Sequence, residues 1–293
     1  MTLFFQQLIS GLAIGFVYAG LALALSVVYE GAGVLNFAQG EMATVSAFLA
    51  WVLTTRGMTF WLAFPIVLVI SFVLGVAVER IFIRPLERAS EQELLMVTLA
   101  LYLGINAIVG WSAGYLQKTL TSPFGSDVWI VHGTFITSQQ VGAAAVLVGV
   151  LLLVGILFQR TSIGLRIRAA AQNPESSRLL GISVGWMLAL GWGIAAVVGA
   201  AAGTMAAPTI GLQPDMMGPV LLLAFAAAAL GGFGSRVGAV VGGLVIGVAS
   251  SLAAQYVDLL AGDLNQIVPF AVILVVLLFR PQGLFGRASA LRV

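Results

Sequence analysis

The stretch GVLNFAQGEMATVSAF, residues 33–48, decides the fold, because it places strongly polar side chains inside an apolar run. Asn36, Gln39 and Glu41 lie within six residues of one another. A charged side chain at the centre of an isolated membrane helix costs about 2.5–3.5 kcal/mol on insertion scales. We therefore expect Glu41 to face protein or water rather than lipid, on a helix that has a buried face.

The composition of the chain indicates a polytopic membrane protein. Of its 293 residues 60% are hydrophobic and 8% are charged, and the mean hydropathy is +1.09, whereas about a quarter of the residues are charged in soluble domains. The absence of cysteine excludes disulfides and thiolate metal sites, and the single histidine, His132, cannot form a histidine cluster. The 13 basic residues are too few and too scattered for a nucleic-acid surface.

The hydrophobic pattern predicts an all-α fold with eight or nine membrane segments in one membrane domain, residues 1–293. A bilayer core requires about 20 mostly apolar residues as helix. The predicted segments are 7–28, 35–53, 60–82, 93–111, 139–158, 186–207, 218–231, 237–257 and 264–279. The seventh is too short to cross comfortably, so it is interpreted as half of a broken or re-entrant element, and both span counts stay open.

The distribution of arginine predicts the orientation, since cytoplasmic loops retain positive charge. If all nine segments cross, eleven of the basic residues share one side, and only Arg56 and Lys118 lie opposite. This split favours an extracytoplasmic N-terminus and a cytoplasmic C-terminus. A second segment that only re-enters the membrane would instead place the N-terminus inside. The loop 112–138 is expected outside, and the loop 159–185 inside.

The inner loop contains the signals of a short helix. Asn173 suits the N-cap, Pro174 the first helical position, Glu175 the positive helix end and Gly181 the C-terminal stop. A helix of about two turns is marginal alone and needs a surface to lie on. Its apolar edge fits either lipid headgroups or a groove on a cytoplasmic partner, and both interpretations are open at this point.

The glycines indicate close helix packing. Gly11 and Gly15, Gly199 and Gly203, Gly238 and Gly242, and Gly243 and Gly247 form small-xxx-small pairs. The dense tract of residues 230–243 predicts a tight helix-turn-helix. It lacks the phosphate-loop pattern, and the only lysine is Lys118, so the chain has no ATPase site of the P-loop type. The similar Gly11–Gly15 and Gly243–Gly247 patterns are attributed to chance rather than to an internal repeat.

Three interpretations of residues 33–48 remain open. The first is structural, with Asn36 capping the incoming helix and with Gln39 and Glu41 bonding to backbone groups freed at a break near Gly40. The others are a direct role in substrate passage and a conformational hinge. Interhelical bonding or loop exposure is preferred to substrate contact for Asn106, Gln255 and Asp258.

Four blocks of the sequence resemble the permease subunits of branched-chain amino acid (Liv-type) ABC importers. GVLNFAQGEMATVSAF is similar to the second-segment signature of that family, and ERIFIRPLERAS, residues 79–90, to its Arg-Pro loop. GLRIRAAAQNPESSRLLGISV resembles the coupling-helix loop, and AAAALGGFGSRVGAVVGGLVIG the late glycine-rich segment. The blocks occur in family order and cover nearly the whole chain.

The resemblance implies a role for each block. The residues that would couple to the ATPase are Arg166, Arg168, Asn173, Pro174, Glu175, Ser177, Arg178, Leu179, Leu180 and Gly181. The residues of the path or structural signature are Asn36, Phe37, Gln39, Gly40, Glu41 and Thr44. The glycine-rich helix contacts are Gly231, Gly232, Gly234, Gly238, Gly242 and Gly243. Ser183, Val184, Gly185 and Trp186 depart from the common charged continuation of the coupling loop.

The resemblance also implies partners. These are a second related permease, two cytoplasmic ATPases that bind ATP and Mg²⁺, and an extracytoplasmic solute-binding protein. A heterodimer of two permeases is favoured over a homodimer. The chain itself would hold no cofactor or metal and catalyse no reaction, and it would lie in the bacterial inner membrane. The substrate is expected to be an amino acid of branched-chain type, although amides, urea and small organic acids are also handled by the family.

Two other functions compete with this interpretation. An ion- or proton-coupled secondary transporter would use an intramembrane carboxylate, for which Glu41 is the candidate. A membrane enzyme would require a catalytic constellation, and the chain contains no HExxH motif, no GxSxG motif and no close Ser/His pair.

Overall fold

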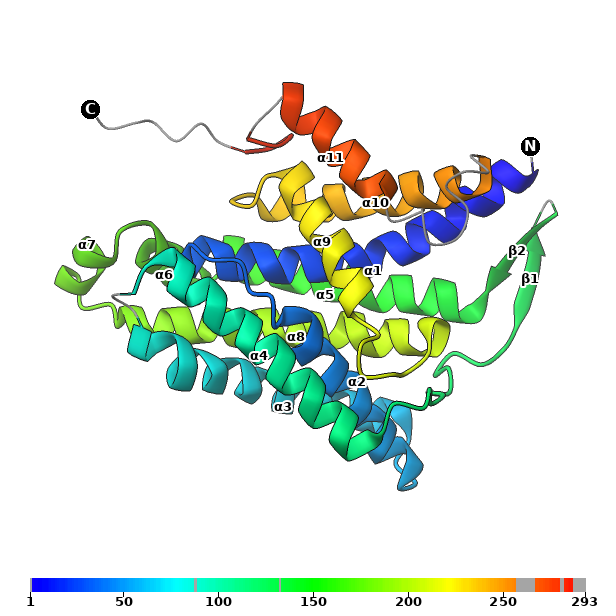
Figure 1. Ribbon diagram of the computed structural model, residues 1–293, viewed down its shortest axis with the longest axis horizontal. Helices are drawn as coiled ribbons and strands as arrows, with labels where there is room; N and C mark the ends of the chain where they lie inside the picture. The colour runs from blue at the N-terminus through cyan, green and yellow to red at the C-terminus, as the bar shows by residue number, and fades with distance from the viewer. Residues whose placement is uncertain (1, 87–88, 132, 257–266, 280–281, 287–293) are drawn as a thin grey trace.

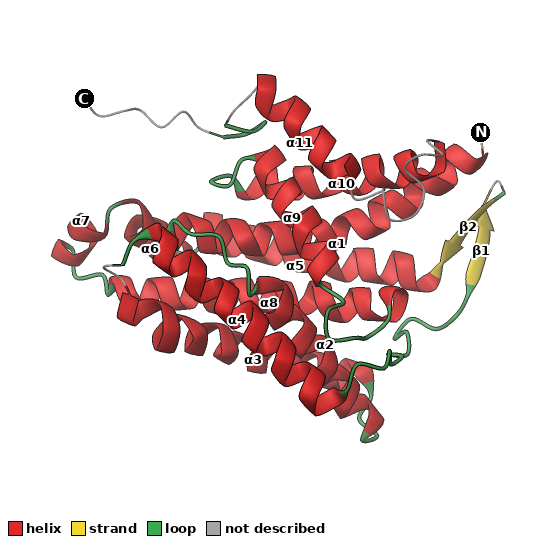
Figure 2. Cartoon of the chain, viewed as in Figure 1, coloured by secondary structure: helices red, strands yellow, loops and turns green. Residues whose placement is uncertain are grey.

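The computed structural model describes residues 2–86, 89–131, 133–256, 267–279 and 282–286, and these residues are mainly helical (Figures 1 and 2). The helices are α1 (Thr2–Ala32), α2 (Gln39–Thr55), α3 (Phe60–Val78), α4 (Glu91–Ala113), α5 (Ser138–Arg160), α6 (Ser162–Gln172), α7 (Pro174–Leu179), α8 (Val184–Ile210), α9 (Gly218–Gly231), α10 (Arg236–Tyr256) and α11 (Ile267–Phe279). A π-helical turn η1 (Glu79–Ile83) and a 3₁₀ turn η2 (Arg84–Leu86) continue α3.

The bundle has two ends that differ in structure. At the hairpin end, β1 (Val128–Val131) pairs with β2 (Thr134–Thr137), and Gln6 near the start of α1 exchanges two hydrogen bonds with Phe135. At the opposite end, which we call the α7 end, the Arg236 guanidinium donates to both carboxylate oxygens of Glu30 at 2.6 and 2.7 Å. The long helices run between these two ends (Figure 1).

Two irregular segments turn back into the bundle, so α2 and α9 begin in its interior. Residues 33–38 leave the α7 end of α1 and lead to α2, which runs on to the hairpin end (Figure 2). Residues 211–217 leave the hairpin end of α8 and lead to α9, which runs to the α7 end. Ala38 and Met217, the residues just before the two helices, are fully buried. Both helices are therefore half-helices.

The described helices agree with the predicted segments in part. Six are long and apolar enough to cross a membrane, namely Thr2–Ala32, Phe60–Leu86, Glu91–Ala113, Ser138–Arg160, Val184–Ile210 and Arg236–Tyr256. The second predicted segment was placed at 35–53, but its helix begins only at Gln39, because residues 33–38 are irregular. The seventh segment is a 14-residue half-helix as expected, but the break precedes Gly218 instead of following Gly231.

Each of the two long loops contains an element that sequence patterns did not reveal. The loop 112–138 carries the β-hairpin, which departs from the all-α prediction. The loop 159–185 carries two helices instead of one, because α6 precedes the predicted short helix. Gly164, Ile167 and Ala170 of α6 are buried at helical spacing, so α6 lies along the bundle by its apolar face.

Glycine faces hold the most tightly packed helices together. A Cβ on Gly247 of α10 would overlap the Cα of Gly15 and the carbonyl of Gly11 on α1. The similar glycine patterns at 11–15 and 243–247 are thus the two sides of one helix contact. On the other side of α10, a Cβ on Gly242 would overlap the carbonyl of Ala227 on α9. Small residues permit this backbone approach, as the sequence predicted.

We expect Gly247→Ala to destabilise the protein, because the added methyl group would have to displace the backbone of α1. Overpacking of this kind costs about 1–3 kcal/mol. The matched control is Gly149→Ala on α5, where a Cβ would meet no atom within 4 Å, and where replacing a mid-helix glycine gains about 0.5–1 kcal/mol. Thermal unfolding of both purified variants in detergent measures the difference. A Gly247→Ala protein as stable as the control would contradict the packing argument.

Candidate functional site

The beginnings of α2 and α9 meet in the bundle interior, and we call this region the half-helix junction. The rings of Phe37 and Phe225 lie with centroids 4.8 Å apart. A Cβ on Gly40 would come within 3.2 Å of both the carbonyl oxygen of Met217 and the Cβ of Leu221. Gly40 therefore permits close contact between the two half-helices, as its place near a break suggested.

Two amides fix the irregular segment that precedes α2. Asn36 and Gln39 are buried, and the Asn36 Nδ2 donates to the Gln39 Oε1 at 3.1 Å. The Asn36 Oδ1 accepts from the Ala38 N–H, while the Gln39 Nε2 donates to the carbonyl of Ala195 on α8 at 3.0 Å. Asn36 was expected to cap α2, but the N-cap is Ala38, without a side-chain cap. Asn36 instead orders the turn before the helix.

Glu41 is fully buried in the first turn of α2, away from lipid as the sequence required. Its Oε2 accepts from the Asn106 Nδ2 of α4 at 3.4 Å, and the same amide donates to the carbonyl of Pro214 at 3.1 Å. Among the described residues, the Oε1 of Glu41 has no hydrogen-bond partner. Asn106 thus connects α2, α4 and the segment that enters α9, which is the interhelical role preferred for it.

Asp215 lies in the second irregular segment, next to the junction, and its carboxyl group interacts electrostatically with that of Glu41. Unlike Glu41, it is exposed. Tyr102 of α4 interacts electrostatically with both carboxyl groups. The junction therefore combines two positive helix ends with two acidic groups.

Other polar side chains of the helices bond within one helix or between two helices. Thr44 donates to the carbonyl of Gly40, and Thr204 donates to that of Ala200 in its own helix. Gln255 accepts from the Gln7 Nε2 of α1 at 2.9 Å. Asp258 lies outside the described residues. These bonds leave Thr44 and Thr204 with satisfied donors inside their own helices.

The short helix predicted in the loop 159–185 is present as α7. The Asn173 Oδ1 accepts from the Ser176 N–H at 3.0 Å, Pro174 occupies the first turn, and Gly181 follows the helix with φ +75°. A positive φ is readily adopted by glycine, so Gly181 ends the helix sharply. Ser177 is buried and marks the side of α7 that lies on the bundle.

The outer side of α7 presents a mixed apolar and charged surface. Leu179 and Leu180 are 89% and 79% exposed, and Glu175 and Arg178 are exposed beside them. Arg166 on α6 is also exposed, whereas Arg168 is half-buried with its Nε unpartnered among the described residues. The charged and apolar residues assigned to coupling thus come together at one end of the molecule, where two leucines point away from the protein.

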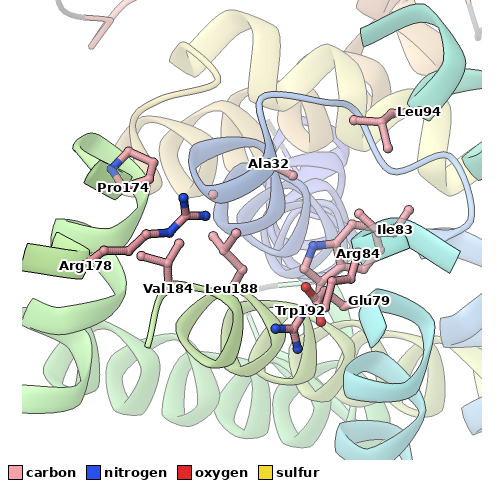
Figure 3. A pocket seen from close by; sticks show the side chains of 11 residues that line it. Ala32, Glu79, Ile83, Arg84, Leu94, Pro174, Arg178, Val184, Leu188 and Trp192 are labelled. Atoms are coloured by element: carbon pink, nitrogen blue, oxygen red, sulfur yellow. The ribbon is translucent and has the colours of Figure 1, made fainter. Parts of the chain in front are cut away.

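A cavity of about 220 Å³ lies behind α7. Pro174 and Arg178 form one wall, and Glu79, Arg84 and Trp192 lie on the opposite side, with Leu188 of α8 between them (Figure 3). The helix α7 is therefore backed by a partly open space rather than by a solid core.

The chain's departure from the usual coupling-loop pattern has a structural counterpart. Trp186, in the first turn of α8, lies under the Arg80 guanidinium of η1 at 3.8 Å from the ring centroid. A Cβ on the preceding Gly185 would lie 2.9 Å from the nearest Arg84 guanidinium nitrogen. The start of α8 is thus held by two arginines of the Arg-Pro loop, through a cation–π contact and close packing.

The glycine-rich segment forms the predicted tight turn between α9 and α10. Backbone atoms of the opposite helix closely face Gly231, Gly238 and Gly242, whereas Gly243 faces Ala19 of α1. Gly232 has φ +92° at the turn, and Gly234 has open space around its Cβ position. Packing explains all of these glycines except Gly234.

Sequence reasoning missed Asp215, Tyr102 and the contact between Arg80 and Trp186. The signal for Asp215 was its place just before Gly218-Pro219, since an acidic residue ahead of a proline at the first turn is typical of a helix start. Within the described ranges, no group of three or more His, Cys, Asp or Glu side chains is placed to hold a metal ion.

Comparison with known proteins supports one family. A family model described as "Branched-chain amino acid transport system / permease component" matches residues 7–277. The chain is 29% identical to the high-affinity branched-chain amino acid transport system permease protein BraD of Pseudomonas aeruginosa, over 99% of this chain and 98% of BraD. It is 30% identical to LivH of Salmonella typhimurium, a permease protein of the same description, with the same coverage.

A solved structure supports the fold alone. PsaBC from Streptococcus pneumoniae, in complex with Fab, aligns with a TM-score of 0.52 at 11% identity, over 96% of this chain and 93% of that chain. The family match extends from α1 to α11 and includes both half-helices and α7. The chain therefore belongs to the family of branched-chain amino acid transport permease components and is a membrane protein with several apolar helices.

Proposed function

We propose that this chain is the membrane subunit of a binding-protein-dependent ABC importer and forms the translocation path for an amino acid of the branched-chain type. ATP hydrolysis on partner subunits would drive the transport, since the sequence contains no P-loop. The names of the relatives support the substrate class, because BraD and LivH are both branched-chain amino acid permeases.

The observation that carries the proposal is the exposed surface of α7. A six-residue helix is far too short to be stable by itself, yet it is capped at both ends and projects two leucines outward. Exposed leucines beside Glu175 and Arg178 suit a groove on another protein better than water. We infer that an ATPase subunit covers this surface and that α7 is the coupling helix, with the residues 166–181 at or beside the contact.

The arginines support a cytoplasmic position for the α7 end. The described basic residues at this end are Arg80, Arg84, Arg160, Arg166, Arg168, Arg178 and Arg236, and those at the hairpin end are Arg56 and Lys118. If residues 33–55 and 211–231 each count as one crossing, the chain makes nine passes. The N-terminus would then be extracytoplasmic and the C-terminus cytoplasmic, in the bacterial inner membrane.

The half-helix junction is the proposed part of the path within this chain. Discontinuous helices in other transporters direct their positive ends toward anionic substrate groups, and α2 and α9 begin here at Gln39 and Gly218. Asn36 and Gln39 would hold the break in α2 open, and Phe37 and Gly40 would shape the contact with α9. Glu41 would act mainly in structure, because it bonds through Asn106 to the second break.

The proposed assembly contains several partners. A second related permease, as a heterodimer, would complete the path, and two cytoplasmic ATPases would bind ATP and Mg²⁺. An extracytoplasmic solute-binding protein would dock at the hairpin end and supply most of the specificity. The chain would bring no cofactor of its own and interact with no nucleic acid.

The double variant Glu175→Ala/Arg178→Ala tests the coupling role. We expect the protein to insert and assemble normally, because both side chains are exposed, while stimulation of ATP hydrolysis by loaded binding protein is lost. The ATPase rate of the purified transporter in liposomes, with and without loaded binding protein, measures this effect.

The control variant is Glu91→Ala/Arg160→Ala, which removes the same types of charge from exposed positions at the α7 end but outside α7. It should retain stimulation. If the α7 variant responds to loaded binding protein as strongly as this control, α7 is not the coupling helix.

Glu41→Gln separates the importer from a proton-coupled carrier. We expect partial transport to remain, because the glutamine oxygen can still accept from Asn106, whereas Glu41→Ala should lose more, because the half-buried Asn106 amide would keep only its bond to the Pro214 carbonyl. Uptake of labelled L-leucine into proteoliposomes loaded with ATP is the measurement. Transport that persists without ATP but stops when an uncoupler collapses the proton gradient would favour the carrier.

A further inference from the structure

A cavity of about 310 Å³ opens beside the half-helix junction, between α4 and α9. Phe37, Leu99, Tyr102, Asp215, Leu221 and Leu222 line it. This volume is at the lower end of the range for ligand sites in proteins, which suits a small solute. The cavity lies at the point where both half-helices begin, so a molecule in it would be next to both helix ends.

The charge of the cavity favours a cation. Asp215 is the charged member among the lining residues that the structure describes. A cleft with acidic groups and low-dielectric walls concentrates positively charged solutes. An ammonium group is therefore the natural partner of the exposed Asp215 carboxylate.

The remaining walls suit the other parts of an aliphatic amino acid. Leu99 and Leu222 are 37% and 44% exposed, and together with Leu221 and Phe37 they offer an apolar surface for a branched side chain. The Tyr102 hydroxyl can donate a hydrogen bond to a carboxylate, and the positive end of α9 favours the same group. An acidic group, a hydroxyl donor and an apolar wall thus occur in one small cavity.

We propose that this cavity is a substrate site in which Asp215 receives the ammonium group and the leucines receive the side chain of an aliphatic amino acid. The proposal rests on the proposed function and adds the part of the substrate that this chain recognises. The Asp215 carboxylate would contact the ammonium group of the substrate. Glu41, which bonds to Asn106, would hold the Pro214 carbonyl beside Asp215.

The cysteine-free sequence permits a direct test by thiol labelling. Leu222→Cys places a reactive group on the cavity wall, and the assembled transporter is treated with cationic 2-aminoethyl or anionic 2-sulfonatoethyl methanethiosulfonate. We expect the cationic reagent to react about tenfold faster, from electrostatic focusing. Adding Asp215→Asn should abolish most of this preference, whereas Asp127→Asn, at an exposed position outside the cavity, should leave it intact.

Protection by small probes identifies the ligand class. In the Leu222→Cys transporter, L-leucine should slow the labelling of the introduced thiol. Isoamylamine, which keeps the ammonium group and side chain, should slow it less, and 4-methylpentanoate, which lacks the ammonium group, should not slow it. Asp215→Asn should remove the protection by L-leucine. It should also reduce L-leucine uptake while loaded binding protein still stimulates ATP hydrolysis.

Several results would overturn the proposal. These are a thiol that does not react, equal rates with both reagents, a preference unchanged by Asp215→Asn, or protection by 4-methylpentanoate. If Leu222→Cys does not fold, Leu99→Cys on α4 provides the same readout from the opposite wall. If any of these results occurs while loaded binding protein still stimulates the ATPase normally, the substrate site in this cavity is rejected and the proposed function is not. Absence of such stimulation in the transporter assembled with the unsubstituted chain rejects the proposed function itself.

Discussion

The structure depends on satisfying backbone groups where two helices begin inside the bundle. In hydrocarbon an unpaired peptide group costs several kcal/mol, so a broken helix is tolerated only where protein or water meets its ends. Here side chains supply that environment: Asn36 bonds to the Ala38 N–H, and Asn106 bonds to the Pro214 carbonyl. The polar residues Asn36 and Asn106 are therefore needed first of all because they allow helices to begin inside the bundle.

The two breaks are arranged alike but in opposite directions. The helix α1 crosses to the α7 end, residues 33–38 return to the interior, and α2 leads to the hairpin end. The helix α8 crosses the other way, residues 211–217 return, and α9 leads to the α7 end (Figures 1 and 2). The positive ends of both half-helices consequently lie at one place. The carboxyl groups of Glu41 and Asp215 lie at that same place, which makes it chemically distinct from the apolar bundle around it.

The parts of the structure that could be predicted from the sequence are those set by neighbours along the chain. The caps of α7 involve Asn173, Pro174 and Gly181, which lie within one short stretch, and the small-xxx-small pairs predict contact faces by helical spacing alone. The burial of Glu41 followed from the cost of a charge in lipid.

The parts that could not be predicted depend on tertiary contacts. Nothing in the local pattern brings Asp215 next to Glu41, because Asp215 lies in the irregular segment before α9 and Glu41 lies in α2, and only the fold brings these two segments together. The β-hairpin has strands of four residues, which are too short for a periodic signal. Residues 35–38 were predicted as the start of a membrane helix because they continue the apolar run that follows them, and only the burial of Asn36 reveals their role.

A continuous set of contacts leads from α7 to the junction through α8. The segment after α7 enters α8 at Val184, where Arg80 stacks on Trp186, so α3 and α8 are joined at the α7 end. Farther along α8, the Ala195 carbonyl accepts from Gln39, and the backbone of Ala43 in α2 lies against Gly203. The helix α8 therefore links the surroundings of α7 to the start of α2. Packed side chains and hydrogen bonds along α8 join the end of the bundle to the polar break in its middle, and energetic coupling between distant sites is carried by networks of this kind.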